Sequence, residues 1–327
     1  MSHQGALLEV EDLRTWFPIR RGIIPRTVAN VKAVDGVSFT VAAQEVLGIA
    51  GESGSGKTTI GRSILRLIEP TDGAVRFKGT DVGGLAPKAL RLFRRKAQIV
   101  FQDPFASLDP KMTVEQVLAE PLRIQGLCRT ARQRRERVVE LLETVALSSE
   151  YLKRAPSELS GGQRQRVGIG RALAVEPQFI VADEPVSALD VSIQAQIINL
   201  LKDLKERLGL SILFISHDIA VMEYLSDRIA VVYLGKIMEI GPTAAICSRP
   251  RHPYTRALLS AVPDPAARSR GERIVLTGEL PSPVDPPSGC VFRTRCPYAI
   301  GACAEAAPPK REVGPGHFTA CIRDDVI

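Results

Sequence analysis

The sequence predicts an α/β fold with a mostly parallel sheet, and three observations support this prediction. Short apolar runs typical of buried strands recur at 46–50, 97–101, 178–182 and 211–215, with helical periodicity between them. A glycine-rich loop links the first run to an apolar helix. Alternating apolar and polar residues at 31–41 indicate an antiparallel strand. We therefore expect a parallel core with an added antiparallel β-subdomain.

The glycine-rich loop reads GESGSGKTT and fills the P-loop pattern G-x-x-x-x-G-K-[ST], which predicts a RecA-like P-loop NTPase core. Glycines let consecutive N–H groups point toward phosphate, and the positive end of the following helix favours the anion. Lys57 is expected to reach the β- and γ-phosphates, and the Thr58 hydroxyl to ligate Mg²⁺. The predicted ATP-binding residues of the loop are Gly51, Ser53, Gly54, Ser55, Gly56, Lys57, Thr58 and Thr59.

Length and composition are those of a globular protein. The 327 residues allow one large and one small domain, with 45% hydrophobic and 24% charged residues. The net charge of +7 fits a nucleotide, an acidic membrane surface or nucleic acid equally well. No apolar run approaches the ~18 residues of a membrane span, and the N-terminus does not resemble a signal peptide. We expect a cytosolic chain that touches a membrane only through partners.

Near the N-terminus, residues 7–10 and 13–18 read as two strands, and the Arg-, Gly- and Pro-rich stretch 20–30 reads as an exposed loop. An aromatic residue just upstream of a nucleotide loop could stack on adenine. From position alone, the sequence favours a residue packed in the core at the edge of a sheet over a stacking role for Phe17.

Polar residues follow two of the predicted buried strands. Asp183 and Glu184 come directly after 178–182, at the strand end where α/β sheets bind ligands. Asp183 is expected to hold Mg²⁺ through water, and Glu184 to orient or deprotonate the attacking water. His217 follows the strand 211–215 and is expected to contact the γ-phosphate.

Residues 104–160 read as a helical insertion. Thr113 and Gln116 form a capping-box pattern, and 130–145 has one apolar face. Leu159-Ser160-Gly161-Gly162-Gln163 then opens another helix, with Ser160 as its N-cap and a second end suited to anions. Taken alone, the Ser-Gly-Gly run could be no more than a turn and a cap.

Together these segments resemble the ATP-binding subunit of ABC transporters. The resemblance covers 1–245 and rests on the P-loop, Gln102, LSGGQ at 159–163, Asp183-Glu184, SALD at 187–190 and His217. It implies a head-to-tail dimer, with ATP between the P-loop of one subunit and Ser160, Gly161, Gly162 and Gln163 of the other. It also implies that Gln102 senses Mg²⁺ and nucleotide. Gln102 would then share the Mg²⁺ site with Thr58 and Asp183, and it would act in catalysis together with Glu184 and His217. The insertion would dock on membrane subunits, and Phe17 would stack on adenine, with Trp16 as the alternative.

The tail, 246–327, resembles the C-terminal extension of oligopeptide/dipeptide-type importer ATPases. The resemblance rests on RHPYT at 251–255 and GELPSP at 278–283, and the Pro-rich stretch 262–289 reads as an extended wrap. It implies an ATPase that energises import of peptides or a related small solute, peripheral to the cytoplasmic face of the inner membrane. Implied partners are a second, related but different ATPase subunit, two permease subunits and an extracytoplasmic solute-binding protein, without nucleic acid.

Two alternatives remain open for this function. One is import of nickel or another non-peptide solute, since specificity resides in other subunits of such systems. The other is a soluble ABC ATPase acting on nucleic acid, suggested by the net charge of +7 and the Arg-rich segments 91–96 and 129–137.

Four cysteines, Cys290, Cys296, Cys303 and Cys321, fall in the tail. Disulfides are disfavoured in a cytosolic chain, and the spacings do not match zinc knuckles. Four thiolates suit a 4Fe-4S cluster, and the tail is similar to that of family members carrying one. Zinc and metal-free thiols are the alternatives.

Overall fold

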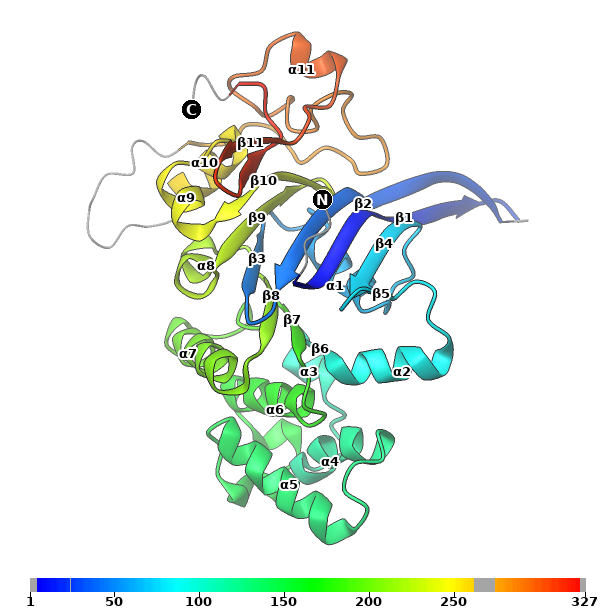
Figure 1. Cartoon of the computed structure of the whole chain (residues 1–327), viewed down its shortest axis with the longest axis vertical. Helices are drawn as coiled ribbons and strands as arrows, with labels where there is room; N and C mark the ends of the chain where they lie inside the picture. The colour runs from blue at the N-terminus through cyan, green and yellow to red at the C-terminus, as the bar shows by residue number, and fades with distance from the viewer. Residues whose placement is uncertain (1–4, 24, 262–273, 324–327) are drawn as a thin grey trace. The chain divides into compact units, whose positions relative to one another are not determined.

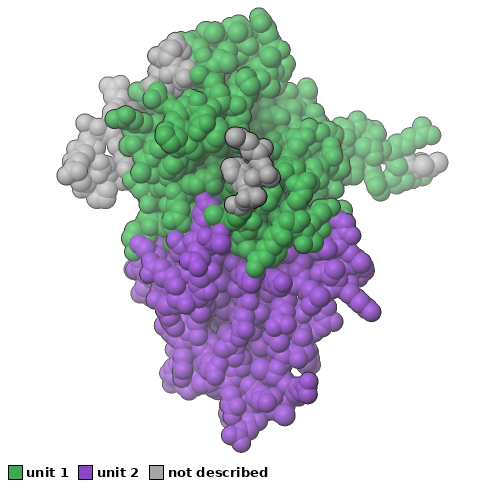
Figure 2. All heavy atoms as spheres, in the orientation of Figure 1, with its two compact units in different colours: residues 1–42, 46–83, 216–327 green, residues 43–45, 84–215 purple. Residues whose placement is uncertain are grey.

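The computed structural model describes residues 5–23, 25–261 and 274–323. It divides into two compact units, shown in different colours in Figure 2. The first comprises residues 1–42, 46–83 and 216–327, and the second comprises residues 43–45 and 84–215. Part of the predicted Pro-rich wrap, 262–273, lies outside the described residues.

An antiparallel sheet in the first unit contains the predicted β-subdomain. Its strands run in the order β2-β1-β4-β5. The predicted strands 7–10 and 13–18 are one continuous strand with a register irregularity between Val10 and Leu13, where Asp12 has a φ of 44°. The strand bounds are β1 (Ala6–Arg21), β2 (Arg26–Ala42), β4 (Asp72–Phe77) and β5 (Thr80–Asp81).

The predicted loop at 20–30 is wrong. Strands β1 and β2 extend into it from both sides as a long hairpin, pairing Arg20 with Thr27 and Arg21 with Arg26 (Figure 1). Cross-strand backbone hydrogen bonds outweigh the low strand propensity of these Arg- and Pro-rich residues, because β propensity depends on the neighbouring strand more than on composition.

The first unit also contains the strand that leads into the P-loop. Strand β3 pairs in parallel with β9, and β10, β12 and β11 follow as antiparallel neighbours in that order. Strands β9 and β10 form an antiparallel hairpin. The elements are β3 (Val46–Ala50), α1 (Lys57–Ile64), α8 (Ile219–Leu225), β9 (Arg228–Tyr233), β10 (Lys236–Pro242), α9 (Thr243–Ser248), α10 (Pro253–Ser260), α11 (Ala302–Glu305), β11 (Arg311–Gly314) and β12 (His317–Thr319).

The C-terminal region is joined to this sheet. Strand β12 pairs with β10 through Thr319 opposite Glu239 and Phe318 opposite Ile240. The buried Glu239 carboxylate accepts a 2.6 Å contact from Nε2 of the buried His317. The division at 245/246 therefore remains a prediction about functional modules, because residues on both sides of it share one sheet.

The second unit is a three-stranded parallel sheet with helices. Strands β8, β7 and β6 are neighbours in that order. Strands β7 and β8 are buried throughout, as the apolar runs predict, whereas the two central residues of β6 are half-buried. The bounds are α2 (Pro87–Lys96), β6 (Ala97–Val100), α6 (Gly161–Leu173), β7 (Phe179–Asp183), α7 (Val191–Leu208) and β8 (Ser211–Ile215).

Between β6 and α6 the chain is helical. The elements there are α3 (Pro104–Ser107), α4 (Val114–Ile124), α5 (Ala131–Thr144) and short 3-10 turns at Ser149–Lys153 and Pro156–Glu158. The capping box of α4 forms as predicted, since Thr113 Oγ1 accepts from Gln116 N–H and Gln116 Oε1 accepts from Thr113 N–H. None of the helices in the described part of the chain is long and apolar enough to cross a bilayer.

Candidate nucleotide-binding site

The P-loop in the first unit has a backbone that only glycine accommodates at its ends. Gly51 and Gly56 have φ values of 152° and 102°, and a Cβ atom at either would overlap a backbone carbonyl oxygen, of Val232 or Ala33. Gly54 also has positive φ, of 79°. The glycine pattern that predicted the loop is therefore a steric requirement of its conformation.

Helix α1 begins at Lys57 with its first turn available for an anion. Its N-cap, Gly56, supplies no side-chain hydrogen bond, and the first turn has no acidic residue. The adjoining hydroxyl of Ser55 is buried and has no hydrogen-bond partner among the described residues. An uncapped helix N-terminus beside a buried donor is suited to phosphate oxygens.

The Lys57 ammonium lies over the loop. Its Nζ atom donates to the carbonyl oxygens of Gly51 at 2.7 Å and Glu52 at 2.8 Å. These bonds hold the positive charge of Lys57 against the loop backbone, where it can attract a phosphate bound by the loop. Ser53 and Gly54 are exposed, whereas Thr58 and Thr59 are half-buried on α1.

In the second unit, two predicted catalytic side chains meet. Gln102, just after β6, donates from Nε2 to Oε2 of Glu184 at 3.1 Å. Glu184 has a φ of 46°, unusual for a non-glycine residue, and its carbonyl accepts bonds from both N–H and Oγ of Ser187. The preceding carboxylate, Asp183, is fully buried at the end of β7. The backbone strain at Glu184 is thus held by its neighbours, as at many functional sites.

The LSGGQ segment begins α6 with a complete capping box. Ser160 is the N-cap, as predicted: its Oγ accepts from Gln163 N–H at 3.3 Å, and Gln163 Oε1 accepts from Ser160 N–H at 2.9 Å. The amide of Gln163 also donates to the Tyr151 hydroxyl at 2.9 Å. A Cβ atom on Gly162 would lie 2.5 Å from Cγ2 of Ile193, so the second glycine permits the approach of α7.

The remaining predicted site residues, Phe17 and His217, both lie in the first unit and are both exposed. Phe17 lies on β1 opposite Val31 and is 39% exposed, so it is available for stacking. Its neighbour Trp16 is covered by the Lys32 ammonium, 5.4 Å from the ring centroid. His217 is exposed just after β8. Phe17, the P-loop and His217 belong to the first unit, whereas Gln102, Ser160–Gln163, Asp183 and Glu184 belong to the second.

The four tail cysteines are free thiols, and Cys321 lies close enough to the other three for their charges to interact. The pKa of Cys321 is raised to about 11, mainly by burial and to a smaller extent by the charges of the other three thiols. The backbone N–H of Cys290 donates to the carbonyl of Cys303 at 2.8 Å. Four soft thiols are a donor set that suits iron–sulfur or zinc. Yet within the described residues no group of three or more potential ligands is arranged to hold a metal ion, so the cluster remains a prediction.

Sequence reasoning missed one set of residues at the P-loop. The Glu52 carboxylate is paired with Arg295, and its backbone N–H donates to the Tyr254 hydroxyl at 2.9 Å. Tyr254 belongs to the His-Pro-Tyr run, which from sequence served only as a marker of the tail. No local signal could reveal the pairing, because Arg295 is 243 positions away from Glu52.

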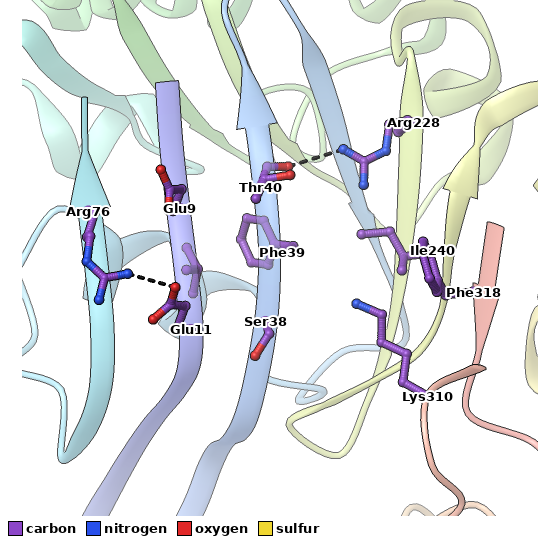
Figure 3. A pocket seen from close by; sticks show the side chains of 11 residues that line it. Glu9, Glu11, Ser38, Phe39, Thr40, Arg76, Arg228, Ile240, Lys310 and Phe318 are labelled. Atoms are coloured by element: carbon purple, nitrogen blue, oxygen red, sulfur yellow. Dashed lines mark hydrogen bonds and ion pairs between the residues drawn. The ribbon is translucent and has the colours of Figure 1, made fainter. Parts of the chain in front are cut away.

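A cavity of about 540 Å³ lies elsewhere in the first unit (Figure 3). Lys310 and Arg228 face it from one side, and Glu9 and Glu11 lie on the other. Burial lowers the pKa of Lys310, and the nearby Arg228 charge lowers it further. The residues that line this cavity include none of the predicted nucleotide-binding residues, so it is distinct from the P-loop site.

Comparison with known proteins agrees with this geometry. The profile of the ABC transporter family matches residues 34–187, and that of the oligopeptide/dipeptide transporter C-terminal region matches 238–303. A Brucella ovis protein, whose name describes a peptide import ATP-binding protein, is 60% identical over 91% of this chain and 94% of its own length. The oligopeptide transport ATP-binding protein AppF of Bacillus subtilis is 52% identical over 98% of both chains.

Solved structures agree as well. A dimeric ATP-binding cassette in a post-hydrolysis state, bound to ADP and Pi, has a TM-score of 0.64 and 30% identity, over 72% of this chain and 98% of its own. A component of an ABC transporter complex from Clostridium perfringens has the same TM-score of 0.64 and 25% identity, over 75% and 92% of the two chains.

The fold and the P-loop define the class: the chain is an ABC-type ATPase. Within that class, it belongs to the ABC transporter ATP-binding proteins that carry the oligopeptide/dipeptide transporter C-terminal region.

Proposed function

We propose that this chain hydrolyses ATP to energise import of peptides through a membrane complex. The names of its relatives describe peptide import and oligopeptide transport, and they support a peptide as the transported solute. The observation that carries the proposal is the 3.1 Å hydrogen bond between Gln102 and Glu184. This bond joins Glu184, the side chain proposed to activate water, to Gln102. Gln102 directly precedes the helical segment, because the next residue, Asp103, is the N-cap of α3. A movement of that segment would therefore change the position of Glu184.

The proposed mechanism assigns each group a task. The P-loop N–H groups and Lys57 bind the β- and γ-phosphates, Phe17 stacks on adenine, and Glu184 accepts a proton from the attacking water. His217 contacts the γ-phosphate. The Thr58 hydroxyl and the buried Asp183 carboxylate are oxygen donors that fit Mg²⁺, with Gln102 as a further oxygen ligand. When bound, Mg²⁺ neutralises charge on the phosphates.

We propose that ATP is held between two such subunits, the P-loop of one facing Ser160, Gly161, Gly162 and Gln163 of the other. The dimeric cassette bound to ADP and Pi supports this arrangement. The remaining partners would be a related second ATPase, two permease subunits and a solute-binding protein. The chain would then lie peripherally on the cytoplasmic face of the inner membrane.

The test is Glu184→Gln in the full membrane complex. Because the amide cannot accept the proton from water, turnover should fall by about 100-fold or more while ATP binding persists. Unchanged turnover would remove Glu184 from its proposed role. Peptide uptake into vesicles that contain the complex, compared with uptake of Ni²⁺, decides the solute class.

We further propose that Cys290, Cys296, Cys303 and Cys321 hold a 4Fe-4S cluster that staples the tail. Their proximity and their soft thiol chemistry support this proposal. Anaerobic purification followed by iron and sulfide analysis is the test, with Cys128→Ser as a control outside the cluster. Iron-free protein containing zinc would favour zinc, and protein free of both metals would favour bare thiols.

A further inference from the structure

Glu52, the second residue of the P-loop, is held by a side chain from the C-terminal region. Nη1 of Arg295 lies 2.7 Å from Oε2 of Glu52, and Nη2 lies 3.2 Å from Oε1. The Arg295 side chain is 9% exposed and that of Glu52 28%. Two parallel hydrogen bonds between a guanidinium and a carboxylate, partly shielded from water, fix geometry more firmly than an exposed ion pair does.

The backbone of Glu52 is fixed from the same side. Its N–H donates to the hydroxyl of Tyr254 at 2.9 Å, and the buried Tyr254 ring packs against Tyr233 and Phe292, with centroids 4.8 and 5.2 Å away. The carbonyl of Glu52 accepts from Lys57 at 2.8 Å. The N–H, the carbonyl and the carboxylate of this one residue are therefore all held, and the carbonyl is also a contact of the phosphate-binding lysine.

The charge of Glu52 makes the pairing important for a nucleotide. A carboxylate in the P-loop repels a polyphosphate unless a cation cancels its charge. Arg295 supplies that cation, and its rigid fork also limits the positions available to a loop that has glycines at both ends. Reducing the freedom of a loop before it binds improves affinity, because less conformational entropy is lost on binding.

Arg295 is in turn positioned by the cysteine-bearing turn. The backbone N–H of Arg295 donates to the carbonyl of Phe292 at 3.0 Å, and the backbone N–H of Arg293 donates to the carbonyl of Cys290 at 3.0 Å. Cys296 directly follows Arg295 in the chain. The conformation of this turn therefore sets where the guanidinium lies.

We propose that Arg295 is a positioning residue for nucleotide binding. Through its ion pair with Glu52 it holds the P-loop in the phosphate-binding conformation and cancels a negative charge beside the phosphates. The C-terminal region thereby becomes part of the nucleotide site without touching the nucleotide. This inference rests on the proposed role of the P-loop.

The experiment measures binding of Mg·ADP to the purified full-length chain by titration calorimetry. Arg295→Ala should weaken binding about tenfold or more, because it leaves a carboxylate unpaired beside the phosphates. Arg293→Ala is the matched control, since Arg293 lies in the same turn and its side chain donates hydrogen bonds to Ser288, away from Glu52. Equal affinity of wild type and Arg295→Ala would overturn the inference, whereas absence of binding to wild type would overturn the proposed function.

A second variant separates positioning from loss of folding. In Arg295→Ala with Glu52→Gln the repulsive charge is gone, so affinity should recover to within a few-fold of wild type. A double variant that binds as weakly as Arg295→Ala would overturn the charge argument and leave Arg295 a structural residue. In the assembled complex, KM for ATP should rise while kcat stays within about twofold. Iron content and melting temperature are measured on every variant. If the variants that lose affinity for Mg·ADP also lose iron or melt at a lower temperature, the inference is overturned.

Discussion

His252 offers a direct test of how burial in the C-terminal region governs stability. The side chain is buried, and its Nδ1 atom accepts from the N–H of Tyr254 at 3.1 Å, which caps α10. Its Nε2 atom has no hydrogen-bond partner among the described residues. Protonation would place a charge in an apolar site and convert the capping acceptor into a donor. Burial accordingly lowers the pKa of His252 from 6.5 to about 3.

The sign of the effect follows from proton uptake. Between pH 6.5 and about 3 the unfolded chain binds a proton at His252 that the folded chain does not bind. The free energy of unfolding therefore falls as the pH is lowered through this range, and the stability is fully present above pH 6.5. At about 1.4 kcal/mol per pH unit, a change from pH 7 to 5 should remove about 2 kcal/mol.

The assay is urea unfolding of the full chain at pH 7 and pH 5, for wild type and His252→Asn. Asparagine can still accept the capping hydrogen bond but does not titrate, so the variant should lose about 2 kcal/mol less than wild type over this interval. Other titrating groups contribute equally to both proteins. Identical pH dependence in the two proteins would show that His252 is not held neutral by burial.

Three further predictions concern close contacts. Gly56→Ala should abolish nucleotide binding and lower the melting temperature, because the new Cβ would overlap a backbone carbonyl; calorimetry and thermal denaturation check this. Gly162→Ala should lower ATPase activity by displacing α7, and adding Ile193→Ala should restore it; if the double variant stays as slow, the steric explanation fails. His317→Ala should destabilise the chain by about 3–5 kcal/mol, because it leaves the buried Glu239 carboxylate with the N–H of Arg251 but without the His317 imidazole, whereas a loss below about 1 kcal/mol in urea unfolding would contradict this reasoning.

Local signals account for what the sequence predicts well. The caps at Thr113 and Ser160 depend on residues three positions apart, and both form as predicted. The buried strands are recognisable because both their faces are apolar. The hydrogen bond of Gln102 to Glu184 was not predicted, although both residues were singled out, because strand order and register decide which strand ends meet.

Long-range contacts account for what the sequence does not reveal. The β1–β2 hairpin extends through a stretch whose composition favours a loop, because strand pairing overrides local propensity. The pairing of Glu52 with Arg295 joins residues 243 positions apart, each of which reads as an ordinary exposed charge. Whether the four cysteines hold a metal depends on the placement of side chains, which spacing alone does not fix.

The pairing of β12 with β10 bears on how this protein can be shortened. A chain ended at residue 245 would retain the whole predicted ATPase module but lose the strand that covers β10. The freed N–H and C=O groups of β10 would then be open to pairing with another chain, and Glu239 would keep its buried carboxylate without His317. Such a truncation should aggregate on expression even though every residue predicted to contact ATP is present, so a minimal expressible ATPase has to extend at least through Thr319.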